Sequence, residues 1–345
     1  MDTKQIEIAL EPEYTAGELA VLSQLAEANG IATIWVTNDT QARDLFMLFT
    51  KAAEVTSRIR LGVMAISPFE IHPLKMSIAL QTLNEMSSGR ASIVVGGAGA
   101  IQANAKLDLS RRVRAVRECI EILKATNAHK PVNLAGEIYP VWRFQPRWAI
   151  DPPPRVLAGA NGDQMLRMAA RKADGIHMSD IPLPLVPAAV AKVSKALAQH
   201  DRPVEGFEFN NFWAFHVKKD HHEAEMEARS RLILRGMLQT HYLEPFLDEA
   251  DVQLVRDNVA SFYKPLYNRE AFYASDGTFE NIPEPVAQTL VDSLSLVSSI
   301  AELDERLQVL HDFAAAGLTH ITLGLHDDPA DTIRIIGERV VPAFH

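Results

Sequence analysis

The sequence predicts a (β/α)8 TIM barrel, in which parallel strands alternate with helices. Short apolar runs alternate along most of the chain with segments whose apolar residues have helical spacing. The runs are apolar on both faces, which is typical of a parallel sheet covered by helices. Eight such runs occur, and eight parallel strands close a barrel. A doubly wound sheet is the competing architecture, but it rarely needs eight strands.

The first part of the chain supplies four strands, each followed by a helix. The expected strands cover residues 6–10, 33–37, 60–66 and 91–97, and the expected helices cover residues 15–29, 41–57, 73–87 and 109–126. Gly30 suits the end of the first helix, and Pro73 suits the first position of the third.

The alternation resumes after a proline-rich break at residues 152–154. The expected strands cover residues 155–160, 174–178, 207–218 and 319–325, and the expected helices cover residues 164–172, 185–199, 221–239, 300–316 and 329–341. Two regions interrupt the pattern, an expected hairpin loop at about 130–154 and a polar and aromatic segment at about 241–297. We therefore expect one barrel domain over residues 1–345 with two insertions.

Composition excludes several classes of protein. The chain is 47% hydrophobic and 23% charged, so it can bury a large core and is not a disordered chain. Its single cysteine, Cys119, argues against a disulfide scaffold or a cysteine-based metal site. The net charge of −10 argues against binding to nucleic acid or to an anionic membrane. No signal peptide or membrane-spanning run is seen, so we expect a cytoplasmic protein that acts on a small molecule.

Common catalytic motifs are missing from the sequence. There is no P-loop and no G-x-S-x-G elbow, and His221-His222-Glu223 does not continue as a zinc-protease motif, so no metal is expected. Residues 96–99 form a glycine cluster after a strand, but they lack the third glycine of a dinucleotide-binding fingerprint.

The ends of the barrel strands are the positions expected to carry function, because active sites of this fold lie at the carboxyl ends of the strands. These ends hold Glu11, Asn38, Asp39, Ser67, residues 97–99, residues 159–162, Ser179, Asp180, Gly324 and His326. Two of them are glycine turns that open onto helices. Such turns either permit a tight connection or present backbone N–H groups to a phosphate.

Several of these segments resemble the bacterial-luciferase-like superfamily, and most closely its methylenetetrahydromethanopterin reductase type, which uses coenzyme F420. Residues 35–39, Trp-Val-Thr-Asn-Asp, resemble the family pattern W-[IV]-T-D-H. Residues 67–73 resemble N-P-Y-T-R-H-P, and residues 82–90 resemble T-L-D-E-L-S-G-G-R. Residues 97–99, 173–175 and 316–321 resemble the family's G-x-G, A-D-G and A-G-V-T-H motifs.

The resemblance implies an F420-dependent oxidoreductase that moves a hydride between the cofactor and a small organic substrate. It implies a non-proline cis peptide near residues 64–66, beneath the deazaflavin ring, and a homodimer. The cofactor-binding residues that it implies are Asn38, Ala65, Ile66 and Ser67 near the ring, and Gly97, Ala98, Gly99, Gly159, Ala160, Asn161 and Gly162 at the phosphate.

Two carboxyl groups are the catalytic candidates. Glu11 matches a glutamate at the end of the first strand in the reductase branch, where it would donate a proton, and Asp39 stands where the family usually has histidine. Three alternatives remain open: an FMN-dependent monooxygenase, a barrel that uses NAD(P)H, and a barrel that binds no flavin.

Overall fold

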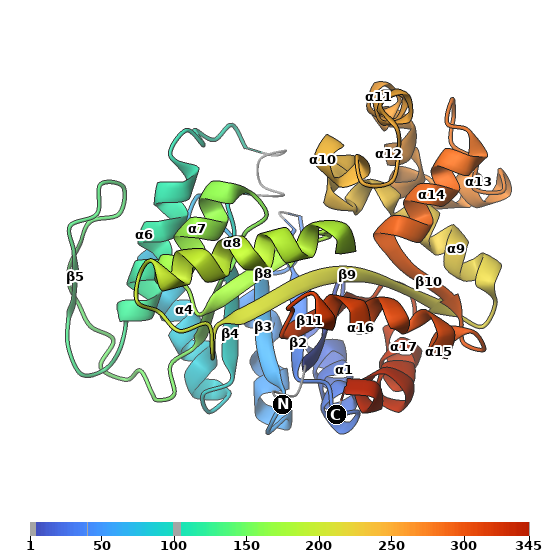
Figure 1. Ribbon diagram of the computed structural model, residues 1–345. Helices are drawn as coiled ribbons and strands as arrows, with labels where there is room; N and C mark the ends of the chain where they lie inside the picture. The colour runs from blue at the N-terminus through green and yellow to red at the C-terminus, as the bar shows by residue number, and fades with distance from the viewer. Residues whose placement is uncertain (1–4, 40, 99–104, 345) are drawn as a thin grey trace.

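The computed structural model describes residues 5–39, 41–98 and 105–344, and it contains a closed barrel of eight parallel strands (Figure 1). The barrel strands, in their order around the ring, are β1 (Gln5–Leu10), β2 (Thr33–Thr37), β3 (Arg60–Ile66), β4 (Ala91–Val95), β7 (Arg155–Gly159), β8 (Gly175–Ser179), β9 (Glu208–Lys218) and β11 (His320–Gly324). The parallel pairing of β11 with β1 closes the ring. The predicted fold class is therefore confirmed.

Helices cover the outside of the barrel, as the apolar spacing predicts. They are α1 (Ala16–Ala28), α2 (Leu45–Leu48), α3 (Thr50–Val55), α4 (Pro73–Met86), α6 (Arg112–Ala125), α7 (Asp163–Lys172), α8 (Val186–Ala198), α15 (Leu303–Arg306), α16 (Gln308–Ala315) and α17 (Pro329–Ile335). Helix α1 begins with a capping box, in which Thr15 and Glu18 each accept a hydrogen bond from the other's backbone N–H.

The core has two layers because side chains alternate along each strand. Ile8 and Leu10 of β1 point outward into the large cluster beneath the helices. Ala9 points inward and joins a small cluster with Trp35, Met64, Val94 and Leu157. This inner cluster forms the apolar floor of the barrel mouth.

Strand β9 is long enough to have three partners. Its eleven residues pair with β8 through 208–212, with β11 through 210–214, and with a further parallel strand, β10 (Ser295–Ser299), through 214–218. Strand β10 begins inside the segment that the sequence suggests as an insertion.

The helix expected over residues 221–239 is shorter than predicted. Helix α9 (His221–Ser230) is followed by two short 3-10 turns, Leu232–Leu234 and Gly236–Leu238. Gly236, Met237 and Leu238 have φ values of 55°, 54° and 48°, in the left-handed region that a right-handed helix cannot contain.

The rest of the long segment forms a group of helices with its own apolar core. These are α10 (Thr240–Leu243), α11 (Glu249–Asp257), α12 (Val259–Tyr267), α13 (Arg269–Ala274) and α14 (Glu284–Leu294), which lie together at the upper right of Figure 1. The expected hairpin is also present, as antiparallel strands β5 (Val132–Leu134) and β6 (Val141–Phe144). Within the described residues, no helix is long and apolar enough to cross a membrane.

Candidate active site

A cavity of about 840 Å³ lies at the carboxyl ends of the barrel strands. Its apolar floor includes Ala9, Met64, Val94 and Phe212. Eight of the residues predicted from the sequence line it, namely Glu11, Asn38, Ala65, Gly97, Gly159, Ala160, Asn161 and Gly162. Its size and largely apolar walls suit a cofactor or substrate rather than a lone ion.

One wall of the cavity contains the peptide bond between Met64 and Ala65, which is cis. The family resemblance implies a non-proline cis bond at this position. The pairing of β3 with β4 shifts register between Val63 and Ile66, next to the same peptide. Asn38 is hydrogen-bonded beside this peptide. Its backbone N–H donates to the carbonyl of Met64, and its side-chain amide donates to Glu70.

Glycine-rich backbone forms another side of the cavity. A Cβ atom on Gly97 would lie 2.7 Å from Cδ of Arg112, whereas one on Gly162 would meet nothing within 4 Å. Gly162 is the N-cap of α7 and Arg112 is the first residue of α6, so two helices begin beside the cavity. Free N–H groups at helix starts and an arginine are typical phosphate ligands, so the described part of this turn fits a phosphate group.

The loop after β7 is fixed by side-chain hydrogen bonds. The Asn161 amide donates to the backbone carbonyl of Ser179 and to the Tyr242 hydroxyl, and its carbonyl accepts from the backbone N–H of Ser179. Tyr242 belongs to α10, so the helical segment after α9 contacts the site directly.

Glu11 lies at the rim of the cavity with one carboxylate oxygen engaged. Its Oε1 accepts a hydrogen bond from the guanidinium of Arg231 and lies 3.0 Å from Nδ1 of His326. No described residue hydrogen-bonds to Oε2. Burial raises the pKa of Glu11 above its ordinary value; Asp327 raises it further, and Arg231 opposes both effects. A carboxyl group with a raised pKa and a free oxygen can act as a general acid or base.

Comparison with known proteins agrees with this geometry. Residues 4–317 match the model of the family described as luciferase-like monooxygenase. The chain belongs to this family. The assignment confirms the resemblance seen in the motifs, and it makes the protein an enzyme of the oxidoreductase class.

Individual relatives match this chain over nearly their whole length. A 5,10-methylenetetrahydromethanopterin reductase from Archaeoglobus fulgidus is 24% identical over 340 residues, which cover 97% of this chain and 98% of the relative. The solved structure of a coenzyme F420 dependent tetrahydromethanopterin reductase from Methanopyrus kandleri has a TM-score of 0.80 at 20% identity and covers 100% of both chains. The FMN complex of the oxygenating constituent of 3,6-diketocamphane monooxygenase from Pseudomonas putida has a TM-score of 0.63 at 16% identity and covers 99% of both chains.

Some predicted site residues do not line the cavity of this luciferase-like barrel. Asp39 is exposed, and its carboxylate accepts from the backbone N–H of Gln41, because a short acidic side chain readily caps the turn that follows it. Ile66 is buried in the outer core, and Ser67 accepts from the backbone N–H of Phe69. Ala98 is buried with a φ of 92°, and Gly99 lies outside the described residues.

The structure brings to the cavity several residues to which the sequence analysis gave no catalytic or cofactor-binding role. They are His177, Asp180, Arg235 and His326. Burial lowers the pKa of His177 to about 4, and its Nε2 lies 3.2 Å from the Thr322 hydroxyl. Asp180 and Arg235 form a buried ion pair of 2.8 Å. Asp180 and His326 follow strands β8 and β11, and these strand-end positions were the only sequence feature that pointed to the two residues.

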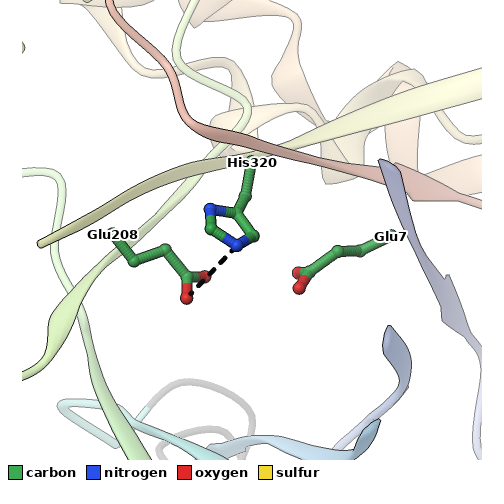
Figure 2. Close-up of side chains that lie close together, drawn as sticks. All are labelled: Glu7, Glu208 and His320. Atoms are coloured by element: carbon green, nitrogen blue, oxygen red, sulfur yellow. Dashed lines mark ion pairs between the residues drawn. The ribbon is translucent and has the colours of Figure 1, made fainter. Parts of the chain in front are cut away.

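A second polar cluster lies inside the amino-terminal end of the barrel, where Glu7, Glu208 and His320 approach one another (Figure 2). Their ligand atoms lie within 4.8 Å of one another, as metal ligands would. However, Arg155 donates to Glu208 over 2.7 Å and to Glu7 over 3.1 Å. The guanidinium therefore stands where a cation would be needed, and the arrangement is an internal ion-pair network.

Proposed function

We propose that this enzyme is a coenzyme F420-dependent oxidoreductase that transfers hydride between the deazaflavin and a small organic substrate, as methylenetetrahydromethanopterin reductases do. The observation that carries the proposal is the match with the Archaeoglobus fulgidus reductase over 97% of this chain and 98% of the relative. The structural likeness to the Methanopyrus kandleri reductase, which also extends over both whole chains, supports it.

The cavity offers suitable groups for such a cofactor. The cis peptide and the apolar floor at Ala9, Met64 and Val94 would lie against a flat ring. The Gly97 turn, the start of α7 and Arg112 would hold the phosphate. When bound, F420 supplies a ring carbon that donates or accepts hydride.

The protein's own task is then to position the substrate and manage a proton. We assign the proton transfer to Oε2 of Glu11, because Arg231 and His326 contact only Oε1. The apolar wall at Met64 and Phe212 limits water near the reacting atoms. We also propose that the substrate is neutral or weakly charged, because Asp180 and Asp327 are paired with Arg235 and Arg231 and balance the charges of these guanidinium groups.

Titration of the purified protein with F420 and, separately, with FMN tests the cofactor assignment. We expect saturable quenching of F420 fluorescence and no tight binding of FMN. Mixing the protein and reduced F420 with candidate pterins, imines and ketones then tests hydride transfer, read as the return of oxidised-cofactor absorbance. Failure to bind F420 would contradict the proposal.

An FMN-dependent monooxygenase is the second candidate. The family description and the likeness to an FMN-bound monooxygenase component favour it. Tight FMN binding with oxygen consumption in the presence of reduced flavin would select this function. Binding of NAD(P)H alone, or of none of these cofactors, would indicate the remaining alternatives.

A further inference from the structure

Behind Glu11, two histidines stack on each other between two carboxylates. The rings of His326 and His216 have centroids 5.0 Å apart and an angle of 15° between their planes. Nδ1 of His326 lies 3.0 Å from Oε1 of Glu11, and Nδ1 of His216 lies 2.7 Å from Oε2 of Glu227. Each imidazole is therefore directed at one carboxylate through the same ring nitrogen.

The opposite nitrogen of each ring has no hydrogen-bond partner among the described residues. Nε2 of His326 and Nε2 of His216 are both buried, and neither makes a hydrogen bond to any described residue. A buried imidazolium would carry a second N–H without an acceptor, at a considerable cost in free energy. Both rings are thus best accommodated as neutral imidazoles with the proton on Nδ1, which makes each a donor to its carboxylate.

We propose that His326 is a positioning residue for Glu11: its neutral imidazole donates from Nδ1 to Oε1 and, with Arg231, leaves Oε2 directed to the substrate. The inference rests on the proposed hydride-transfer function and specifies how its proton-transfer group is held. His326 itself exposes only 4% of its side chain and keeps Nε2 buried, so the carboxyl, with 26% of its side chain exposed, is the group that meets the substrate.

The charges around His326 agree with a neutral ring. Arg231 and Arg235, on the turns after α9, disfavour a positive charge on His326, and a protonated His216 on β9 would do the same. Glu11 and Glu227 favour a positive charge. Asp327 follows His326 in the chain and is paired with Arg231 and Arg269. Burial has the largest effect and lowers the pKa of His326 well below its ordinary value.

A neutral donor has a specific advantage over a charged one at this place. A cationic histidine beside Glu11 would favour the carboxylate strongly and lower the pKa of the acid. A neutral imidazole fixes the carboxyl by a hydrogen bond without adding a charge. Glu11 can then be held in place and keep a pKa above that of an ordinary glutamate.

Two substitutions of His326 separate the hydrogen bond from the ring stack. His326→Phe keeps an aromatic ring against His216 but removes the donor. His326→Asn removes the ring but places an amide N–H near the position of Nδ1. We expect His326→Phe to lower the rate of hydride transfer by about 10–100-fold, because loss of orientation at a reacting group has effects of this size. We expect His326→Asn to recover most of that rate.

Two further measurements accompany the rates in both variants and in the wild type. The F420 dissociation constant should stay unchanged, because His326 is not among the groups proposed to hold the cofactor. The pKa of Glu11, followed by carbon-13 NMR of labelled glutamate and assigned with Glu11→Gln, should rise in His326→Phe and return in His326→Asn, since a donor to the carboxylate stabilises its charged form.

The outcomes distinguish the two proposals. Wild-type rates in His326→Phe, or equal losses of rate in both variants, would overturn the positioning role. So would a pKa of Glu11 that is unchanged in His326→Phe. The carboxyl titration needs no cofactor, so it decides the role of His326 even if the wild-type protein fails to bind F420, a result that overturns the proposed function alone.

Discussion

Nδ1 of His326 lies 3.0 Å from Oε1 of Glu11, although 315 positions separate the two residues in the chain. Strand register explains the contact. Ala9 of β1 is paired with Gly324 of β11, and Glu11 and His326 each lie two residues beyond this pair. Because parallel strands run in the same direction, the two side chains emerge at the same height of the barrel. Closing the barrel therefore assembles the pair of residues that we consider central to proton transfer.

Replacing Glu11 by Gln tests its role directly. We expect the rate of hydride transfer to fall by ~10²–10⁴-fold, the usual contribution of one positioned acid–base group. The amide keeps the shape of the protonated acid, so F420 affinity should change little. Single-turnover measurements with the best substrate compare the two proteins. Glu13→Gln is the matched control, because Glu13 is an exposed glutamate that does not line the cavity, and it should keep the wild-type rate.

The pH dependence follows from the raised pKa of Glu11. If Glu11 donates the proton, activity is present below its pKa and is lost as the pH rises through that value, which lies above that of an ordinary glutamate. If Glu11 instead accepts a proton, in the opposite direction of the reaction, activity is lost as the pH falls through the same pKa. Profiles of kcat/KM against pH show this limb in the wild type, and it should be missing from Glu11→Gln. Equal rates and equal profiles would mean that Glu11 is only structural.

The sequence predicted the barrel well because its strands and helices have strong local patterns. Strand β2 occupies residues 33–37 as expected, and β7 begins at Arg155 as expected. Many residues of the cavity lining were also predictable, since glycine turns and strand ends can be recognised along the chain. Register was not predictable, so the sequence could not show that Glu11 and His326 face each other.

The groups after α9 were missed for a different physical reason. Apolar spacing extends the expected helix through residue 239, but the chain turns at Gly236, where a Cβ atom would lie 2.1 Å from the ring of Tyr242. Met237 and Leu238 also adopt left-handed conformations, which non-glycine residues adopt only when tertiary contacts hold them. The apolar spacing of a sequence does not indicate such tertiary contacts. The positions of Arg231 and Arg235 at the cavity therefore required the structure.

Substitution of Gly162 by Val tests the glycine-lined end of the cavity. The residue has φ −83° and ψ 152°, which valine adopts readily, and its Cβ would meet no protein atom within 4 Å. Folding should be unaffected, while the new side chain should occupy space needed by the cofactor phosphate. We expect F420 affinity to fall by about tenfold or more, equivalent to about 1.4 kcal/mol.

Fluorescence titration measures the affinity of Gly162→Val, and thermal unfolding checks its fold. Gly17→Val is the matched control, because Gly17 lies on α1 and its Cβ would have only ordinary contacts at 3.9 Å. Unchanged affinity in Gly162→Val would remove the start of α7 from the proposed cofactor site.

Stability in acid should depend on Glu227. Burial raises its pKa, but hydrogen bonds from His216 and Lys218 outweigh this and lower it to about 2. The unfolded value is near 4.3. A carboxyl group with a lowered pKa stabilises the fold above its unfolded pKa, and this contribution is lost as the pH falls through the folded value.

Glu227→Gln should therefore lower the free energy of unfolding at pH 7 and reduce the slope of that free energy against pH between about pH 4 and 2. Urea titrations at several pH values measure both effects, and an unaltered slope would contradict the assignment.

The ion-pair network at the base of the barrel predicts a large effect for Arg155. Its guanidinium is the partner of Glu7, which is 0% exposed, and of Glu208, which is 6% exposed. Arg155→Met would leave two buried carboxylates without their counter-charge. Removing one partner from a buried ion pair costs about 3–5 kcal/mol, so we expect a loss of stability of at least this order. Glu208→Gln in the same protein should restore part of the loss, since it removes one of the two orphaned charges.

Denaturant unfolding measures these changes, with Arg167→Met as the control. Arg167 forms an exposed ion pair with Asp163 on α7, and pairs of this kind contribute about 0–1 kcal/mol.

A chelator should leave the melting temperature of the wild type unchanged, because Arg155 lies where a metal ion would neutralise Glu7 and Glu208. A melting temperature that falls with chelator and recovers with added divalent cation would show that these carboxylates and His320 bind a metal. A fully stable Arg155→Met protein would show that the carboxylates do not rely on this guanidinium for their charge balance.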